Sequence, residues 1–172
     1  GEVILPYFRA PLLEVETKAD LSPVTVADRA AEQAIIAHLQ HHFPDYGILG
    51  EEFGAQPGKV NARWIIDPID GTQNFIRGIP FFATLIALEE DGDITSGVMY
   101  APAQDELLYA SRGQGAFANG ERLAVSNLRT LEQGTFLHTS LRLFLRDGYW
   151  GALERLAQAP RRQRHARANV YD

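Results

Sequence analysis

The feature that most constrains this chain is an apolar stretch that ends in two aspartates, Trp64-Ile65-Ile66-Asp67-Pro68-Ile69-Asp70. A short, compact apolar run of this kind is typical of a buried strand. Pro68 has a fixed φ and no N–H group, so the chain is expected to turn after Asp67. Asp67 and Asp70 can then converge on one point, with the Ile69 carbonyl group between them. The segment predicts a strand that delivers two carboxylates to one site.

The residues that follow predict an anion site beside these carboxylates. Gly71 and Thr72 offer backbone N–H groups where a short helix, 72–75, is expected to begin, and such groups bind anions. Carboxylate and carbonyl oxygens are the ligands that Mg²⁺ uses together with phosphate oxygens. The functional interpretation is a metal-and-phosphate site. The alternative is structural, because Asp-Pro and Asp-Gly are common turn dipeptides.

A second acidic segment, Gly50-Glu51-Glu52-Phe53-Gly54, follows another short apolar stretch. Glu-Glu pairs usually face solvent, so this motif by itself is more often structural than catalytic. Two groups of carboxylates at the ends of two apolar strands, however, favour a functional site. Clustered carboxylates raise one another's pKa values unless a cation neutralises them. The two segments together therefore predict bound divalent ions.

The remaining pattern predicts a long helix followed by a sheet. Apolar residues at helical spacing predict a helix over 25–43, with Thr25 or Asp28 capping its first amide groups. Strands are expected at 46–49, 64–66, 83–88, 94–100, 107–110 and 131–137, and a second helix at 149–157. Short turns between successive strands favour antiparallel pairing. The predicted fold class is α/β in the layered α+β sense, with an antiparallel sheet between helices.

Composition excludes several classes of protein. The 22 acidic residues outnumber the 16 basic ones, and the net charge of −6 argues against a protein that coats nucleic acid. No stretch approaches the ~18 consecutive apolar residues that a membrane span requires. The absence of cysteine excludes a disulfide scaffold, a thiolate zinc site and a cysteine nucleophile. We expect a cytoplasmic protein that acts on a small phosphorylated metabolite, with no nucleic-acid or membrane partner.

The two acidic segments resemble the signature of the inositol monophosphatase superfamily of Mg²⁺-dependent phosphatases. The resemblance extends to KADLSPVTVAD at 18–28 and to RGQGAF at 112–117, and it covers roughly residues 1–127. The details GEEFG, SPVT-x-AD and NFIRGIP are most similar to the histidinol-phosphate phosphatase branch. Gln73 stands where inositol-specific members usually have threonine. The resemblance therefore implies hydrolysis of histidinol phosphate, in histidine biosynthesis.

The resemblance also implies a set of metal ligands. Glu51, Asp67 and the Ile69 carbonyl group would hold the first Mg²⁺, for which Mn²⁺ could substitute. Asp67 would bridge to a second ion that Asp70 also binds. On this basis, water activated by two metals would attack the phosphorus atom of a phosphomonoester.

Further residues receive roles from the same resemblance. Thr72 would position the attacking water together with Glu51, and Asp28 would support that network. The amide groups of Gly71 and Thr72 would bind the phosphate. Lys18 would balance the negative charge of the site, with a plain surface lysine as the alternative. Glu52 is expected behind the ligands or in solvent.

The chain departs from the superfamily in one respect. The superfamily adds a fourth carboxylate from a Trp-Asp motif in a later α/β domain, whereas here Trp64 precedes Ile65 and Trp150 precedes Gly151. We expect residues 1–130 to form the metal- and phosphate-binding domain. Residues 131–172 are expected to begin a truncated C-terminal domain. Three alternatives stay open, together with assembly as a homodimer: an inositol phosphate substrate, a 3′-phosphoadenosine nucleotide substrate, or a non-catalytic binding or assembly chain.

Overall fold

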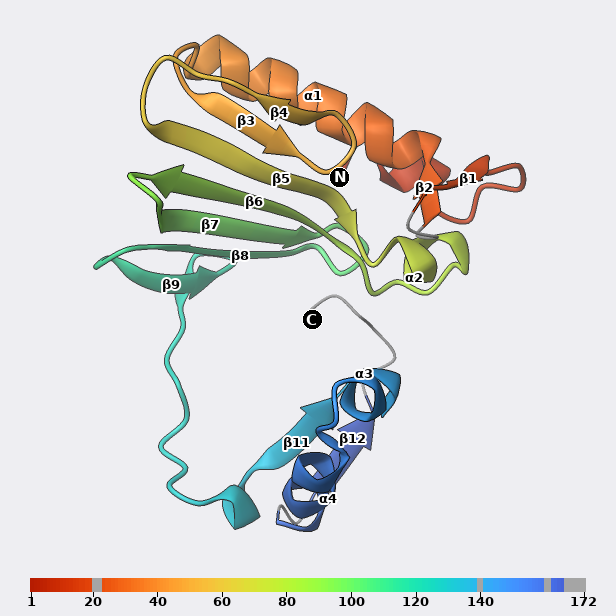
Figure 1. The fold of residues 1–172 in the computed structure, drawn as a ribbon, viewed down its shortest axis with the longest axis vertical. Helices are drawn as coiled ribbons and strands as arrows, with labels where there is room; N and C mark the ends of the chain where they lie inside the picture. The colour runs from red at the N-terminus through yellow and green to blue at the C-terminus, as the bar shows by residue number, and fades with distance from the viewer. Residues whose placement is uncertain (20–22, 139–140, 160–161, 166–172) are drawn as a thin grey trace. The chain divides into compact units, whose positions relative to one another are not determined.

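The computed structural model describes residues 1–19, 23–138, 141–159 and 162–165 of the chain. It forms two compact units, residues 1–123 and 124–172 (Figure 1). The first unit is an eight-stranded sheet with the long helix α1 (Val26–His42) along one face. The strands of the sheet are β3 (Gly47–Gly50), β4 (Gly54–Gln56), β5 (Ala62–Asp70), β6 (Ala83–Glu90), β7 (Asp93–Ala101), β8 (Glu106–Ser111), β9 (Gly115–Ala118) and β10 (Glu121–Arg122).

Three smaller features complete this unit. A 3₁₀ turn (Leu5–Tyr7) lies near the N-terminus, and β1 (Val15–Thr17) pairs antiparallel with β2 (Pro23–Thr25) ahead of α1. The short helix α2 (Thr72–Ile76) follows β5. None of the described helices is both long and apolar enough to cross a membrane.

The strand order β10-β9-β8-β7-β6-β5-β3-β4 confirms the predicted fold class and corrects one detail of the pairing. Neighbouring strands from β5 to β10 are antiparallel, as predicted, but β3 and β5 are parallel. The reason lies in β4, which folds back along the outer edge of β3. The chain then re-enters the sheet on the inner edge of β3 and runs in the same direction.

Helix α1 begins where the sequence predicts, because Thr25 and Asp28 form a capping box. The Thr25 hydroxyl group accepts hydrogen bonds from the amides of Ala27 and Asp28, and the Asp28 side chain accepts one from the Thr25 amide. Farther along the helix, Ile36 and Leu39 pack against apolar residues of β3 and β5. The helix is thereby fixed over the strands that end in the acidic segments.

A second apolar cluster supports the segment that carries the two aspartates. Ile69, Phe75 and Phe82 are almost fully buried, and the rings of Phe75 and Phe82 meet edge to face with centroids 5.0 Å apart. Ala27 and Ala31 of α1 belong to the same cluster. Burying an aliphatic or aromatic side chain stabilises the fold by roughly 1.5–3 kcal/mol. Ile69 therefore anchors the backbone between Asp67 and Asp70.

The second unit is a small α/β arrangement. Strand β11 (Thr135–His138) pairs parallel with β12 (Arg162–His165), and helices α3 (Leu141–Arg146) and α4 (Trp150–Gln158) lie between them in the chain. The predicted helix at 149–157 corresponds to α4. The predicted strand at 131–137 begins too early, because Leu131–Gln133 forms a 3₁₀ turn that ends at Gly134.

Candidate active site

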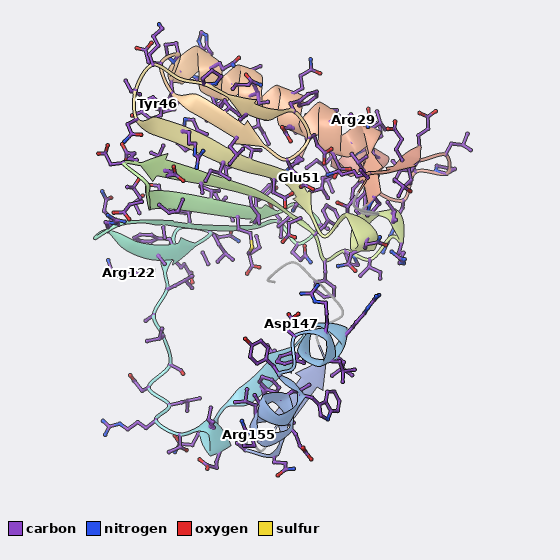
Figure 2. All side chains as sticks on the ribbon, in the orientation of Figure 1. Arg29, Tyr46, Glu51, Arg122, Asp147 and Arg155 are labelled. Atoms are coloured by element: carbon purple, nitrogen blue, oxygen red, sulfur yellow. The ribbon has the colours of Figure 1, made fainter. Side chains whose placement is uncertain are left out.

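Parallel pairing of β3 and β5 brings the two acidic segments to the same end of the sheet, where β3 ends. Gly50 pairs with Ile66, so Glu51, the first residue after β3, lies beside Asp67, the next residue of β5. The Glu51 amide donates a hydrogen bond of 3.1 Å to the Ile66 carbonyl group and holds this juxtaposition. Figure 2 labels Glu51 at the turn that follows β3. The sequence predicted that the carboxyl groups of the two acidic segments lie close together. The parallel pairing of β3 and β5 is what brings Glu51 and Asp67 together.

A bulge in β5 places Asp67 and Asp70 on the same face. Residues three apart in a regular strand point to opposite faces. Here Asp67 pairs with Leu85 and Asp70 with Ala83, so three steps on β5 match two steps on β6. One extra residue in the strand therefore reverses the alternation. Such bulges are common beside active sites because they redirect side chains.

Gly71 and Thr72 form the turn that follows the second aspartate. Gly71 precedes the first residue of α2 and has a φ of 88°. This is a left-handed conformation, which residues with a side chain disfavour. The Thr72 hydroxyl group lies 2.9 Å from the Ile69 carbonyl oxygen and 3.4 Å from Asp28 Oδ1. Thr72 thus links the predicted carbonyl ligand to Asp28. A carbonyl oxygen has a second lone pair, so this contact leaves Ile69 able to bind a cation.

Asp28 reaches the site from the first turn of α1. Its Oδ2 accepts hydrogen bonds from the Thr25 amide at 2.7 Å and the Thr25 hydroxyl at 2.6 Å, while Oδ1 faces Thr72. Burial raises the pKa of Asp28, although the hydrogen bonds from Thr25 oppose the shift. Asp28 has two functions in the structure, because it caps α1 and contacts Thr72.

Lys18 lies on the acidic cluster. Its Nζ atom is 2.7 Å from Glu51 Oε1 and 2.5 Å from Glu52 Oε1. Burial by itself would lower the pKa of Lys18, but the hydrogen bonds to Glu51 and Glu52 outweigh it and raise the pKa. These contacts favour the predicted charge-balancing role of Lys18 over the alternative of a plain surface lysine. The Glu52 side chain is only 6% exposed, so it does not lie in solvent.

Glu32 is a polar residue of this region that the sequence interpretation missed. It is 0% exposed, and its two carboxyl oxygens accept hydrogen bonds from the amides of Glu52 at 2.8 Å and Phe53 at 3.0 Å. The available signal was its position four residues after Asp28, since residues at that spacing share one face of a helix. An acidic residue on the buried face of α1 requires partners of this kind.

The electrostatics concentrate on Asp67. Burial, followed by the charge of Glu51 and a hydrogen bond with it, raises the pKa of Asp67 to about 8. The charges of Asp70 and Asp28 contribute in the same direction. Asp67 Oδ1 is buried and finds no hydrogen-bond partner among the residues that the structure describes. A buried carboxyl oxygen without a donor, beside other carboxylates, is suited to bind a cation.

The donors present fit a hard divalent cation in kind. Carboxylate oxygens of Glu51 and Asp67 and the Ile69 carbonyl group are the oxygen ligands that Mg²⁺ takes. Within the part of the chain that the structure describes, no three carboxyl or imidazole groups are close enough together to hold a metal ion as they stand. Instead, the Lys18 ammonium group is the cation that contacts Glu51. The predicted set of metal ligands, Asp70 included, therefore stays a prediction.

Neighbouring carboxylates at one end of a mixed sheet, one of them with a buried oxygen, beside a turn suited to anions, are typical of metal-dependent phosphatases. The model of the inositol monophosphatase family matches residues 1–143. The chain belongs to the inositol monophosphatase family.

Known relatives carry different names. A histidinol-phosphatase of Chlorobaculum parvum is 45% identical over 139 residues, which is 81% of this chain and 54% of the relative. An inositol-1-monophosphatase of Mesorhizobium japonicum is 51% identical over 115 residues, 66% of this chain and 43% of the relative. The crystal structure of the extragenic suppressor protein suhB of Bartonella henselae superposes with a TM-score of 0.86 at 38% identity, over 95% of this chain and 64% of that one. The chain thus spans about half the length of the curated relatives it matches.

Proposed function

We propose that this chain supplies the metal- and phosphate-binding part of a Mg²⁺-dependent phosphomonoesterase whose substrate is L-histidinol phosphate. The observation that carries the proposal is the convergence of Glu51, just after β3, and Asp67, within the parallel strand β5, where Asp67 Oδ1 is buried and has no hydrogen-bond partner among the described residues. Carboxylates raise one another's pKa in such a cluster, and a bound divalent cation removes that penalty.

Each residue of the site has a role in the proposal. Glu51, Asp67 and the Ile69 carbonyl group would hold one Mg²⁺, and Asp67 and Asp70 would hold a second. When bound, Mg²⁺ makes a water molecule acidic enough to act as a nucleophile and stabilises the leaving oxygen. Thr72 would orient this water, because its hydroxyl group already faces the Ile69 carbonyl oxygen at 2.9 Å.

The phosphate group of the substrate would lie at the turn after Asp70. The amide groups of Gly71 and Thr72 would donate to its oxygens, as backbone amides at helix starts do. Asp28 would keep the Thr72 hydroxyl group in place from the opposite side. The chain thereby contributes groups that bind and orient, while the cation supplies the charge.

Histidinol phosphate is the substrate that the relatives and one residue favour. Relatives named histidinol-phosphatase from Chlorobaculum parvum and Mycobacterium tuberculosis are both 45% identical over about four fifths of this chain. Gln73, which follows the Gly-Thr turn, replaces the threonine that inositol-specific members usually have, and its side chain is exposed. An inositol phosphate and a 3′-phosphoadenosine nucleotide are the competing substrates.

The test is phosphate release from these three substrates over a Mg²⁺ titration. Asp67→Asn is expected to abolish release, whereas the matched variant Asp93→Asn, in an exposed ion pair with Arg112, should leave it unchanged. Calorimetry with Mg²⁺ and inorganic phosphate completes the experiment. Binding without turnover would favour a non-catalytic binding chain, and a chain that binds neither Mg²⁺ nor phosphate would overturn the proposal.

A further inference from the structure

The turn that carries Glu51 and Glu52 rests on the buried carboxyl group of Glu32. This side chain comes from the second turn of α1 and is fully enclosed. Each of its two oxygens accepts one backbone hydrogen bond, from Glu52 at 2.8 Å and from Phe53 at 3.0 Å. Hydrogen bonds from N–H groups to a carboxylate are about twice as strong as those between neutral groups.

The same carboxyl group explains the glycine at position 50. Gly50 is buried at the end of β3, and a methyl group added there would overlap Oε1 and Cδ of Glu32. Only a residue without a side chain lets the backbone approach the carboxyl group so closely. Glu32 therefore contacts the turn in two ways. Its carboxyl oxygens accept hydrogen bonds from the amides of Glu52 and Phe53, and its carboxyl group lies close to the backbone of Gly50.

The turn is held from the opposite side by β5. The Glu51 amide donates to the Ile66 carbonyl group at 3.1 Å, and the next two amides donate to Glu32. Three consecutive amides thus have fixed acceptors on two different elements. Because of this, the direction in which the Glu51 side chain leaves the backbone is set before any ligand binds.

We propose that Glu32 is a positioning residue: it sets the backbone of residues 50–53 so that Glu51 meets Asp67 around a divalent cation. The inference rests on the proposed function, since it names what aligns one of the metal ligands. Groups that orient metal ligands typically change metal affinity 10–100-fold when they are replaced. Glu32 acts through the backbone and does not itself reach the cation.

The experiment measures the dissociation constant of Mg²⁺ by calorimetry on the full chain and its variants. Glu32→Gln keeps the shape but turns one acceptor into a donor that faces an amide N–H group, and it should weaken Mg²⁺ binding about 10–100-fold. Gly50→Ala should weaken it similarly from the other side of the contact. Glu154→Gln is the matched control, because Glu154 is exposed on helix α4. This variant should bind Mg²⁺ with the same affinity as the unaltered chain.

Three outcomes decide between the claims. Unaltered Mg²⁺ affinity in Glu32→Gln, with only a lower unfolding temperature, would show a purely structural role and overturn the inference alone. Failure of the unaltered chain to bind Mg²⁺ would overturn the proposed function and the inference together. If neither variant folds, amide hydrogen exchange of the unaltered chain decides: Glu52 and Phe53 should be protected before Mg²⁺ is added. Unprotected exchange at both amides would refute the inference.

Discussion

Replacing Asp67 by asparagine distinguishes two effects of its buried carboxyl group: the loss of folding stability when the group ionises, and the binding of Mg²⁺. In the unfolded chain Asp67 ionises near its ordinary pKa of 3.8, whereas in the folded chain its pKa is raised to about 8, chiefly by burial. Between these values the folded state binds one proton more than the unfolded state. The free energy of unfolding therefore falls as pH rises through this window. For one proton the slope is at most about 1.4 kcal/mol per pH unit.

Asparagine carries no proton, so the variant lacks this contribution. In a metal chelator, Asp67→Asn should gain stability relative to the unaltered chain as pH rises from about 5 to about 8. Added Mg²⁺ should reverse the order, because it binds the unaltered chain. A hundredfold excess of ligand over its dissociation constant stabilises a folded protein by about 2.7 kcal/mol. The variant should show no such gain.

The measurement is urea unfolding followed by tryptophan fluorescence. Both arms carry Trp150→Phe, since Trp150 lies in the second unit, so that Trp64 of β5 alone reports on the unit with the site. Parallel dependence of stability on pH in the two proteins would refute the argument from carboxylate burial. Equal stabilisation of both by Mg²⁺ would show that Asp67 is not a ligand.

Four further predictions concern neighbouring groups. Gly71→Ala should cost about 1–2 kcal/mol in urea unfolding, because Gly71 has a φ of 88°; an unchanged midpoint would contradict this. Thr25→Ala should remove the capping box and cost about 1 kcal/mol, and circular dichroism should report the loss, whereas Thr25→Ser should restore it. Thr72→Val should cost about 1 kcal/mol through its lost bond to Ile69 and should lower phosphate release; full release would exclude its role. Affinity for Mg²⁺ should rise with pH up to about 8, because Asp67 must lose a proton to bind, and calorimetry in buffers of different ionisation enthalpy should detect that proton.

The local elements around the site could be predicted from sequence because they depend on neighbouring residues. Thr25 and Asp28 begin α1 through bonds within one turn, and Gly71 opens α2 because it tolerates a left-handed conformation. The acidic ends of two apolar strands were likewise readable from local order. The resemblance to the inositol monophosphatase superfamily rests on the same short segments, and the family comparison confirms it.

Other features depend on residues far apart in the chain and could not be read from local patterns. The sequence predicted that Asp67 and Asp70 converge through a turn after Asp67, but β5 continues to Asp70, and a bulge against β6 brings the two side chains to one face instead. In the sequence, Glu32 is an ordinary polar residue of a helix. Its role becomes visible only in the structure, where the turn after β3 donates hydrogen bonds to it.

The sequence by itself determined which chemical groups this protein has at the site and where its main helix begins, since propensity and capping act over a few residues. The tertiary structure decided which of those groups meet. Lys18 contacts Glu51 across 33 positions of the chain, and Glu51 meets Asp67 only because β3 and β5 run parallel. Such contacts arise from the pairing and packing of whole elements, which no local pattern encodes.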